Sequence, residues 1–136
     1  MRDTKTLLFV HLVWGTWDRL PLIHPVNQEA IYSTILTECN DLEVRVLAIG
    51  GIFDHIHLLV KFPPTIAIAY LVKQLKGSSS HLVNNCKQDD IFFKWQGSYG
   101  AFTVAEKDLG DIIRYIKHQP EHHKTGTIMP YFELEG

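Results

Sequence analysis

The sequence is poor in cysteine and in long apolar runs, and these shortages exclude certain classes of protein. Its 136 residues include two cysteines, Cys39 and Cys86, and neither belongs to a Cys-x-x-Cys pair or stands near a histidine at zinc spacing. We interpret both as reduced, buried thiols. No apolar run reaches the roughly 18 residues of a membrane span, and the opening MRDTKTLL has no signal-peptide cleavage pattern. These absences predict a cytoplasmic protein with no membrane partner.

Positive charge is not in excess either. Thirteen Lys and Arg stand against fifteen Asp and Glu, which gives a formal net charge of −2. Proteins that bind nucleic acid usually carry a basic surplus, so any DNA contacts of this chain must be local. With 46% hydrophobic and 21% charged residues, the composition is that of one globular domain over residues 1–136.

What the sequence does contain is a regular alternation of strand-like and helix-like segments. One of the helix-like segments contains Gly77 and three serines, which weakens the prediction of a helix there. Thr103 to Glu106 match a capping box at the start of the helix-like segment nearest the C-terminus. In chain order we predict a strand at Thr6–Trp14, a helix at Val26–Asn40, strands at Val44–Phe53 and His55–Phe62, a helix from Ile66 to about Asn84, extended segments at Phe92–Trp95 and Tyr99–Val104, and a helix at Lys107–Gln119.

The predicted order is β-α-β-β-α-β, with one helix added at the C-terminal end. That order is typical of the ferredoxin-like sandwich, an α+β fold in which the helices lie on one face of the sheet. The fold hosts many functions, so function has to be argued from particular residues.

Two histidines share one face of the third predicted strand. Because side chains alternate along a strand, Ile56 and Leu58 point to the core while His55 and His57 point away from it. A strand fixes the separation of the two rings, which suits a metal site. The pattern is short, however, and two ordinary half-buried histidines would produce it equally well.

A tyrosine and a glutamine stand four residues apart in the last predicted helix. Tyr115 and Gln119 therefore lie one above the other, beside the apolar stripe of Leu109, Ile112, Ile113 and Ile116. Taken alone, the position of Tyr115 predicts a residue at the edge of the core, with a packed ring and a solvent-exposed hydroxyl. Combined with the histidine pair, the four side chains offer two imidazoles, an amide oxygen and a phenol, which could hold one metal ion and present one nucleophile.

These motifs resemble the single-tyrosine HUH transposases of the IS200-like family. The histidine-hydrophobic-histidine motif of that family appears as DHIHLLV, and its tyrosine motif as YIKHQ. Three further segments match in the same order: HLVWGTWDRLPLI, LVKQLKGSSSHLV and WQGSYGAFTV. The resemblance covers nearly the whole chain, and the fold of the family is the ferredoxin-like one.

The resemblance implies an enzyme that cleaves and rejoins single-stranded DNA. Tyr115 would be the nucleophile that forms a 5′-phosphotyrosine link, and His55, His57 and Gln119 would hold Mg²⁺ or Mn²⁺. The DNA would be single-stranded or folded into the hairpin ends of an insertion sequence. The family also implies a homodimer, in which the tyrosine helix of one subunit serves the histidines of the other.

Candidate DNA contacts lie on the second predicted helix. Lys73, Lys76 and Ser80 recur on one side of it, where they could position phosphates, although an ordinary solvated helix face gives the same pattern. Arg19 is a further candidate. Trp14 and Trp17 could stack on unpaired bases or belong to the core. Arg45 is a weaker basic candidate.

The chain departs from the family pattern beside its third metal ligand. Pro120 follows Gln119 directly, and a residue before proline is pushed away from helical geometry. His118, His122 and His123 are therefore alternative ligands. Two other functions stay open: a relative that binds hairpin DNA without cutting it, which the low net charge and Pro120 make possible, and a metal-dependent phosphoesterase in which His55 and His57 activate water and Tyr115 is structural.

Overall fold

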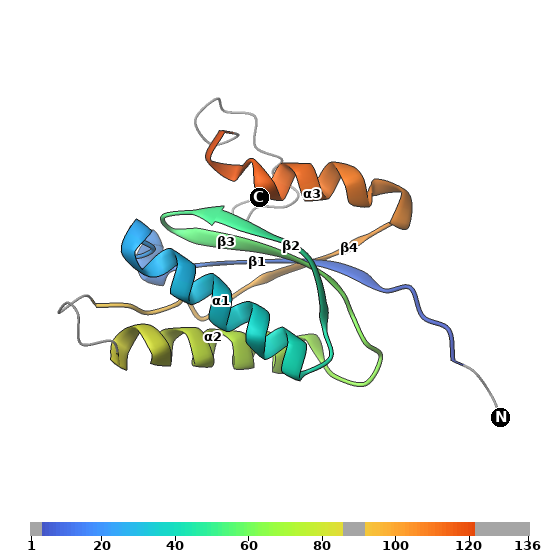
Figure 1. Cartoon of the computed structure of the whole chain (residues 1–136), viewed down its shortest axis with the longest axis horizontal. Coiled ribbons are helices and arrows are strands. Elements are labelled where there is room, and N and C mark those ends of the chain that lie inside the picture. The colour runs from blue at the N-terminus through green and yellow to red at the C-terminus, as the bar shows by residue number, and fades with distance from the viewer. Residues whose placement is uncertain (1–3, 86–91, 122–136) are drawn as a thin grey trace.

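A four-stranded antiparallel sheet forms the centre of the molecule (Figure 1). The computed structural model describes residues 4–85 and 92–121. The strand order is β2-β3-β1-β4. The elements are β1 (Phe9–Gly15), η1 (Trp17–Arg19), α1 (Pro25–Asp41), β2 (Arg45–Ile52), β3 (His55–Lys61), α2 (Ile68–Asn85), β4 (Gly100–Val104), η2 (Glu106–Asp108) and α3 (Leu109–Lys117). The predicted ferredoxin-like order is confirmed.

Helices cover the sheet on both sides. α1 and α2 pack on one face, and the main core lies between them and alternate residues of the central strands, such as Leu12 and Leu58. α3 lies across the opposite face, where Leu59, Ile112 and Ile116 belong to a second, smaller apolar cluster (Figure 1). The prediction of helices on one face therefore holds for α1 and α2, and the added helix creates a third layer.

The predicted capping box was wrong because tertiary pairing overrides the local signal. Thr103 and Val104 pair with Val10 and Phe9 of β1, so they belong to the sheet rather than to a helix cap. The chain then passes through the 3-10 turn η2, whose N-cap residue makes no side-chain hydrogen bond, and α3 begins at Leu109. The extended segment at Phe92–Trp95 contributes a single bridge, between Trp95 and Thr16.

The glycine-serine run does not interrupt α2. The hydroxyl of the buried Ser79 donates to the carbonyl oxygen of Leu75 at 2.6 Å and accepts a hydrogen bond from the indole of Trp95 at 2.9 Å. Its polar group is thereby satisfied inside the core. No helix within the described ranges combines the length and the apolarity needed to cross a bilayer.

A glycine sets how closely α3 approaches the sheet. A Cβ added at Gly50 of β2 would collide with the backbone carbonyl oxygen of Ile116. The absence of a side chain at Gly50 therefore lets the C-terminal half of α3 rest directly on β2 and β3, which is where Tyr115 lies.

Candidate active site

The two histidines of β3 are buried under α3. His55 is 1% exposed and His57 is fully buried, and their ring centroids lie 5.0 Å apart. They do point away from the main core, as predicted. The interpretation of two half-buried side chains is wrong, however, because the last helix closes over this face and excludes water from it.

The structure brings the tyrosine and the glutamine of the last helix to these histidines. The rings of Tyr115 and His57 meet edge to face, with centroids 5.8 Å apart. Oε1 of Gln119 lies 3.2 Å from Nε2 of His55. Tyr115 is 1% exposed and Gln119 is fully buried, so the boundary position predicted for the tyrosine is wrong. All four predicted residues meet within one chain.

Pro120 does not turn Gln119 away from the site. α3 stops at Lys117, and His118 leaves helical geometry with φ −108° and ψ 27°. The side chain of Gln119 still points inward, since its Nε2 is 3.4 Å from the carbonyl oxygen of Tyr115. His118 is 54% exposed and contacts Glu121, so it faces away from the site. His122 and His123 lie outside the described residues.

Two polar neighbours hold the outer nitrogens of the histidine pair. Oδ1 of Asp54 lies 2.8 Å from Nδ1 of His55, and Nε2 of His11 lies 2.8 Å from Nδ1 of His57. Burial acts to raise the pKa of Asp54, but the hydrogen bond from His55 and the charge of Arg19 outweigh it and hold that pKa below its ordinary value. Sequence reasoning did not single out either residue, although His11 is the one polar side chain in an otherwise apolar strand.

Arg19 lies at this site rather than on a distant DNA surface. Its Nη2 is 3.3 Å from Nδ1 of His55 and 3.5 Å from Oδ1 of Asp54. The turn η1 carries it there through positive φ angles of 54° at Asp18 and 53° at Arg19. A guanidinium beside a metal site can contact a phosphate.

Two donor atoms at the centre are spaced as neighbouring ligands of one divalent cation. Two ligands about 2.1 Å from Mg²⁺ at a right angle lie about 3 Å apart, and Nε2 of His55 is separated from Oε1 of Gln119 by 3.2 Å. The amide oxygen is the kind of ligand that suits Mg²⁺ and Mn²⁺, whereas imidazole nitrogens also suit later divalent metals such as Zn²⁺. In the described part of the chain, no three His, Cys, Asp or Glu side chains are arranged to hold a metal, so a cation here would need the amide as its third ligand.

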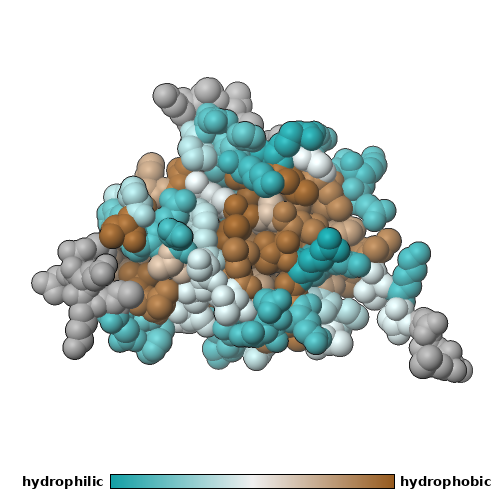
Figure 2. All heavy atoms as spheres, in the orientation of Figure 1, coloured by the Kyte–Doolittle hydropathy of each residue, from teal (hydrophilic) through white to brown (hydrophobic). Residues whose placement is uncertain are grey.

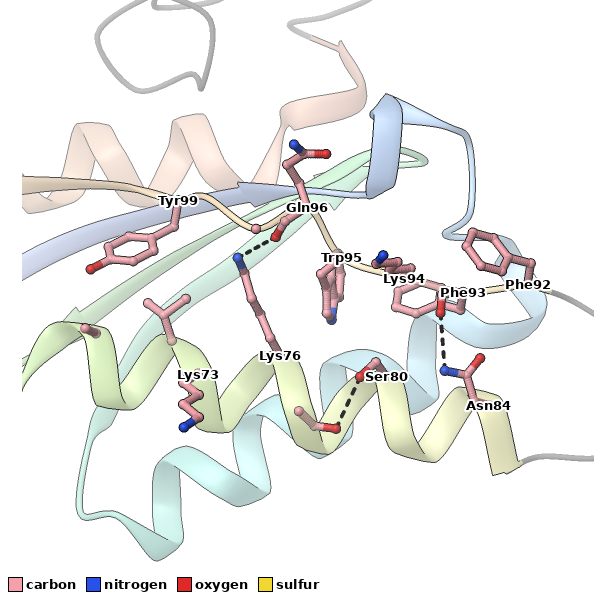
Figure 3. Close-up of a pocket in the computed structure, with 14 residues that line it drawn as sticks. Lys73, Lys76, Ser80, Asn84, Phe92, Phe93, Lys94, Trp95, Gln96 and Tyr99 are labelled. Carbon is pink, nitrogen blue, oxygen red and sulfur yellow. Dashed lines mark hydrogen bonds between the residues drawn. The ribbon is translucent and has the colours of Figure 1, made fainter.

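The predicted basic residues of α2 line a groove on the other side of the sheet (Figure 3). The groove has a volume of about 620 Å³ and runs between α2 and the segment 92–99. Lys73 is exposed along it, and Ser80 contacts the carbonyl oxygen of Gly77. Lys94 and the half-exposed Phe92 and Tyr99 also border it, and the prediction did not include them.

Lys76 has a different environment from Lys73. Its Nζ donates to the carbonyl oxygen of Gln96 at 2.7 Å (Figure 3). It also donates to the carbonyl oxygen of Ser98 at 2.8 Å, and burial lowers the pKa of Lys76. Lys76 therefore braces the segment that faces α2. The two candidate tryptophans also differ in environment: Trp14 is fully buried in the core, and Trp17 is 42% exposed beneath the ammonium of Lys94.

Comparison with known proteins finds similarity to transposases in sequence and in structure. The family described as "Transposase IS200 like" matches residues 4–119. The transposases of the insertion sequence IS200 from Salmonella typhimurium LT2 and Salmonella typhi are each 31% identical over 93% of this chain and 90% of their own length. A protein of Deinococcus radiodurans R1 described as a transposase superposes with a TM-score of 0.69 at 26% identity, over 88% of this chain and 95% of its own. A REP-associated tyrosine transposase bound to a REP hairpin shares the fold, with a TM-score of 0.66 at 13% identity over 94% and 76% of the two chains.

Proposed function

This chain belongs to the IS200-like transposase family, and from that premise we propose that it cuts and rejoins single-stranded DNA in the cytoplasm through a covalent link to Tyr115. A divalent cation held by His55, His57 and Gln119 would assist. The observation that carries the proposal is the meeting of a buried phenol with two imidazoles and an amide oxygen, from strand and helix segments far apart in the sequence.

The chemistry is an in-line displacement at phosphorus. The phenol of Tyr115 loses its proton as its oxygen attacks the scissile phosphate, the bond from phosphorus to the 3′ oxygen breaks, and that oxygen takes up a proton to leave as a 3′-OH. The phosphotyrosine retains the energy of the broken ester, so a second 3′-OH can attack it and rejoin DNA, which releases the phenol. A bound Mg²⁺ or Mn²⁺ would stabilise the negative charge on the phosphate oxygens.

The residues around the phenol have separate roles. His55 and Gln119 face one another across the position that suits a cation, and the ring of His57 packs against the ring of Tyr115, which restricts its orientation. Arg19 is close enough to Nδ1 of His55 to contact a phosphate delivered to the site.

The proposed substrate is DNA with a hairpin at the end of the element. The distantly related structure of the same fold is a transposase bound to a REP hairpin. In this chain the groove along α2 offers the exposed Lys73 and Lys94 together with Phe92 and Tyr99, a combination that suits phosphates next to unpaired bases. Ser80 would add a short hydrogen bond, and Lys76 would keep the opposite wall in place.

We further propose that the working form is a homodimer with shared active sites. In the single chain α3 lies on its own sheet, and an exchange of α3 between two copies would preserve every contact described above. Edge strand β2 supports a second copy, because its apolar Val46, Leu47 and Ile49 are only partly buried. Figure 2 shows apolar side chains gathered over the middle of the face that displays this strand.

A labelled hairpin with single-stranded flanks tests the proposal. After incubation with the protein and Mn²⁺, a denaturing gel should show label that migrates with the protein, and Tyr115→Phe should remove that band. Nicked DNA without an adduct would indicate a phosphoesterase that activates water. Binding without any cleavage would indicate a protein that only holds the hairpin. The same gel with EDTA in place of Mn²⁺ checks the dependence on metal.

A further inference from the structure

The buried histidine of β1 has no part in the function proposed so far. We propose that His11 is a positioning residue, which fixes the ring orientation and the tautomer of His57 so that Nε2 of His57 is the nitrogen presented to the cation. This inference rests on the proposed metal site. In this role His11 neither contacts DNA nor binds the metal, but it determines whether His57 can coordinate the cation.

The sheet register places His11 where this role requires it. In the β1–β3 pairing, Val13 lies opposite His57 and His11 lies opposite Leu59. His11 and His57 are thus diagonal neighbours on the face covered by α3, within reach of long side chains. Their ring centroids lie 5.0 Å apart at an angle of 38°, and Nε2 of His11 is 2.8 Å from Nδ1 of His57.

Burial makes this hydrogen bond significant. His11 is fully buried in a strand whose other residues are apolar. Burying an imidazole without a partner costs free energy, and an apolar residue would pack at this position without that cost. The edge of Phe102 lies against His11, with centroids 6.2 Å apart, so the ring has little freedom to turn away from His57.

The hydrogen bond constrains where the proton of His57 sits. A neutral imidazole has one N–H and one lone pair, so a bond between two ring nitrogens needs one to donate and the other to accept. If Nδ1 of His57 donates to Nε2 of His11, the lone pair of His57 is on its Nε2 and is available to a metal. The reverse arrangement would put the proton on Nε2 of His57 and prevent coordination there.

The other histidine of the pair shows the same construction. Nδ1 of His55 meets the carboxylate of Asp54 at 2.8 Å, and its Nε2 faces Gln119. Metal-binding histidines generally donate their second nitrogen to such a partner. The partner of His55 is the carboxylate of the part-exposed Asp54. The partner of the fully buried His57 is an imidazole, which avoids placing a second negative charge in the interior.

Two substitutions separate positioning from packing. His11→Leu fills the space but accepts no hydrogen bond, and His11→Gln places an amide oxygen near the position of Nε2. Val13→Ala is the matched control, because it removes buried volume from the same strand and face, directly opposite His57, while both hydrogen-bonding rings stay in place. The first readout is the ¹⁵N chemical shifts of the His57 ring in metal-free protein, and the second is Mn²⁺ affinity by direct titration.

We expect the Nδ1–H tautomer of His57 in the wild type and in His11→Gln, and its loss in His11→Leu. Mn²⁺ affinity should fall about 10- to 100-fold in His11→Leu, the usual range for losing such a partner, and recover in His11→Gln. An unchanged tautomer in His11→Leu, or equal affinity losses in His11→Leu and Val13→Ala, would overturn the inference. A wild type that binds no Mn²⁺ would instead remove the proposed metal site, and the tautomer comparison would still decide the role of His11.

Discussion

Nε2 of His55 and Oε1 of Gln119 face each other at 3.2 Å, although the two residues are 64 positions apart in the sequence. His55 is the first residue of strand β3, and Gln119 lies just beyond the end of the short helix α3. Two lone-pair donors at this separation are spaced as neighbouring ligands of one cation. The pair therefore gives the metal hypothesis a specific test.

Replacing the amide should change the metal requirement. We expect Gln119→Leu to raise the Mn²⁺ concentration for half-maximal cleavage at least tenfold, since the loss removes a ligand rather than a supporting partner. Gln119→Glu keeps an oxygen at the same reach and should cleave at wild-type Mn²⁺ levels or below. A metal titration of the cleavage gel measures both. Identical midpoints for wild type and Gln119→Leu would exclude the amide as a ligand.

Each half of this site was predictable from a local period, whereas the meeting of the two halves was expected only from the resemblance to the family. Alternation along a strand puts His55 and His57 on one face, and spacing of four on a helix puts Tyr115 beside Gln119. The role of His11 was not predictable in this way, because its partner depends on how β1 and β3 are registered. Long-range pairing also explains the wrong capping box, since Thr103 is needed opposite Val10 in the sheet.

Pro120 was expected to disturb Gln119, and the structure predicts a small effect instead. The helix has already ended at Lys117, and Gln119 points inward beyond that end. Pro120→Ala should therefore leave the yield of protein–DNA adduct within about threefold of wild type, a difference well under 1 kcal/mol in activation free energy. Adduct formation over time measures this. A loss as large as that of Gln119→Leu would mean that the proline holds the ligand in place.

The two predicted lysines of α2 should behave differently from one another. Lys73 is exposed, so Lys73→Met should reduce the slope of log affinity for hairpin DNA against log salt by about one and leave stability unchanged. Lys76→Met leaves the carbonyl oxygens of Gln96 and Ser98 without their charged donor and should lower the free energy of unfolding by about 1 kcal/mol. Urea unfolding and a salt series of binding curves separate the two. If the two variants changed the salt dependence of binding and the free energy of unfolding equally, the separate roles of Lys73 in DNA binding and Lys76 in stability would be contradicted.

Lys76 also predicts a dependence of stability on pH. Burial lowers its pKa from the ordinary value of 10.5, so the unfolded chain binds its proton more tightly than the folded protein does. Stability contributed by Lys76 should therefore rise as the pH increases from the folded pKa to 10.5. The difference in unfolding free energy between wild type and Lys76→Met should widen in favour of the wild type over that range. A constant difference between pH 8 and 10.5 would show that the proton is held equally in both states.

The position of α3 on the sheet depends on Gly50, and this gives the most direct test of how the site is assembled. Gly50→Ala would place a methyl group against the backbone carbonyl oxygen of Ile116, which cannot move aside as a side chain can. We expect the helix to lift from β2 at a cost of about 1–3 kcal/mol in stability, and the phenol of Tyr115 to withdraw from His57, with most of the adduct lost.

Gly110→Ala is the matched control on the same helix. The nearest atom to an added Cβ at Gly110 is Nη1 of Arg114 at 3.6 Å, an ordinary contact with a flexible side chain. That variant should keep its activity and gain up to about 1 kcal/mol from better helix propensity. If Gly50→Ala forms adduct as well as Gly110→Ala does, the close approach of Ile116 to Gly50 is unnecessary, and the phenol must reach the histidines in an arrangement that lacks this contact, whichever subunit supplies α3.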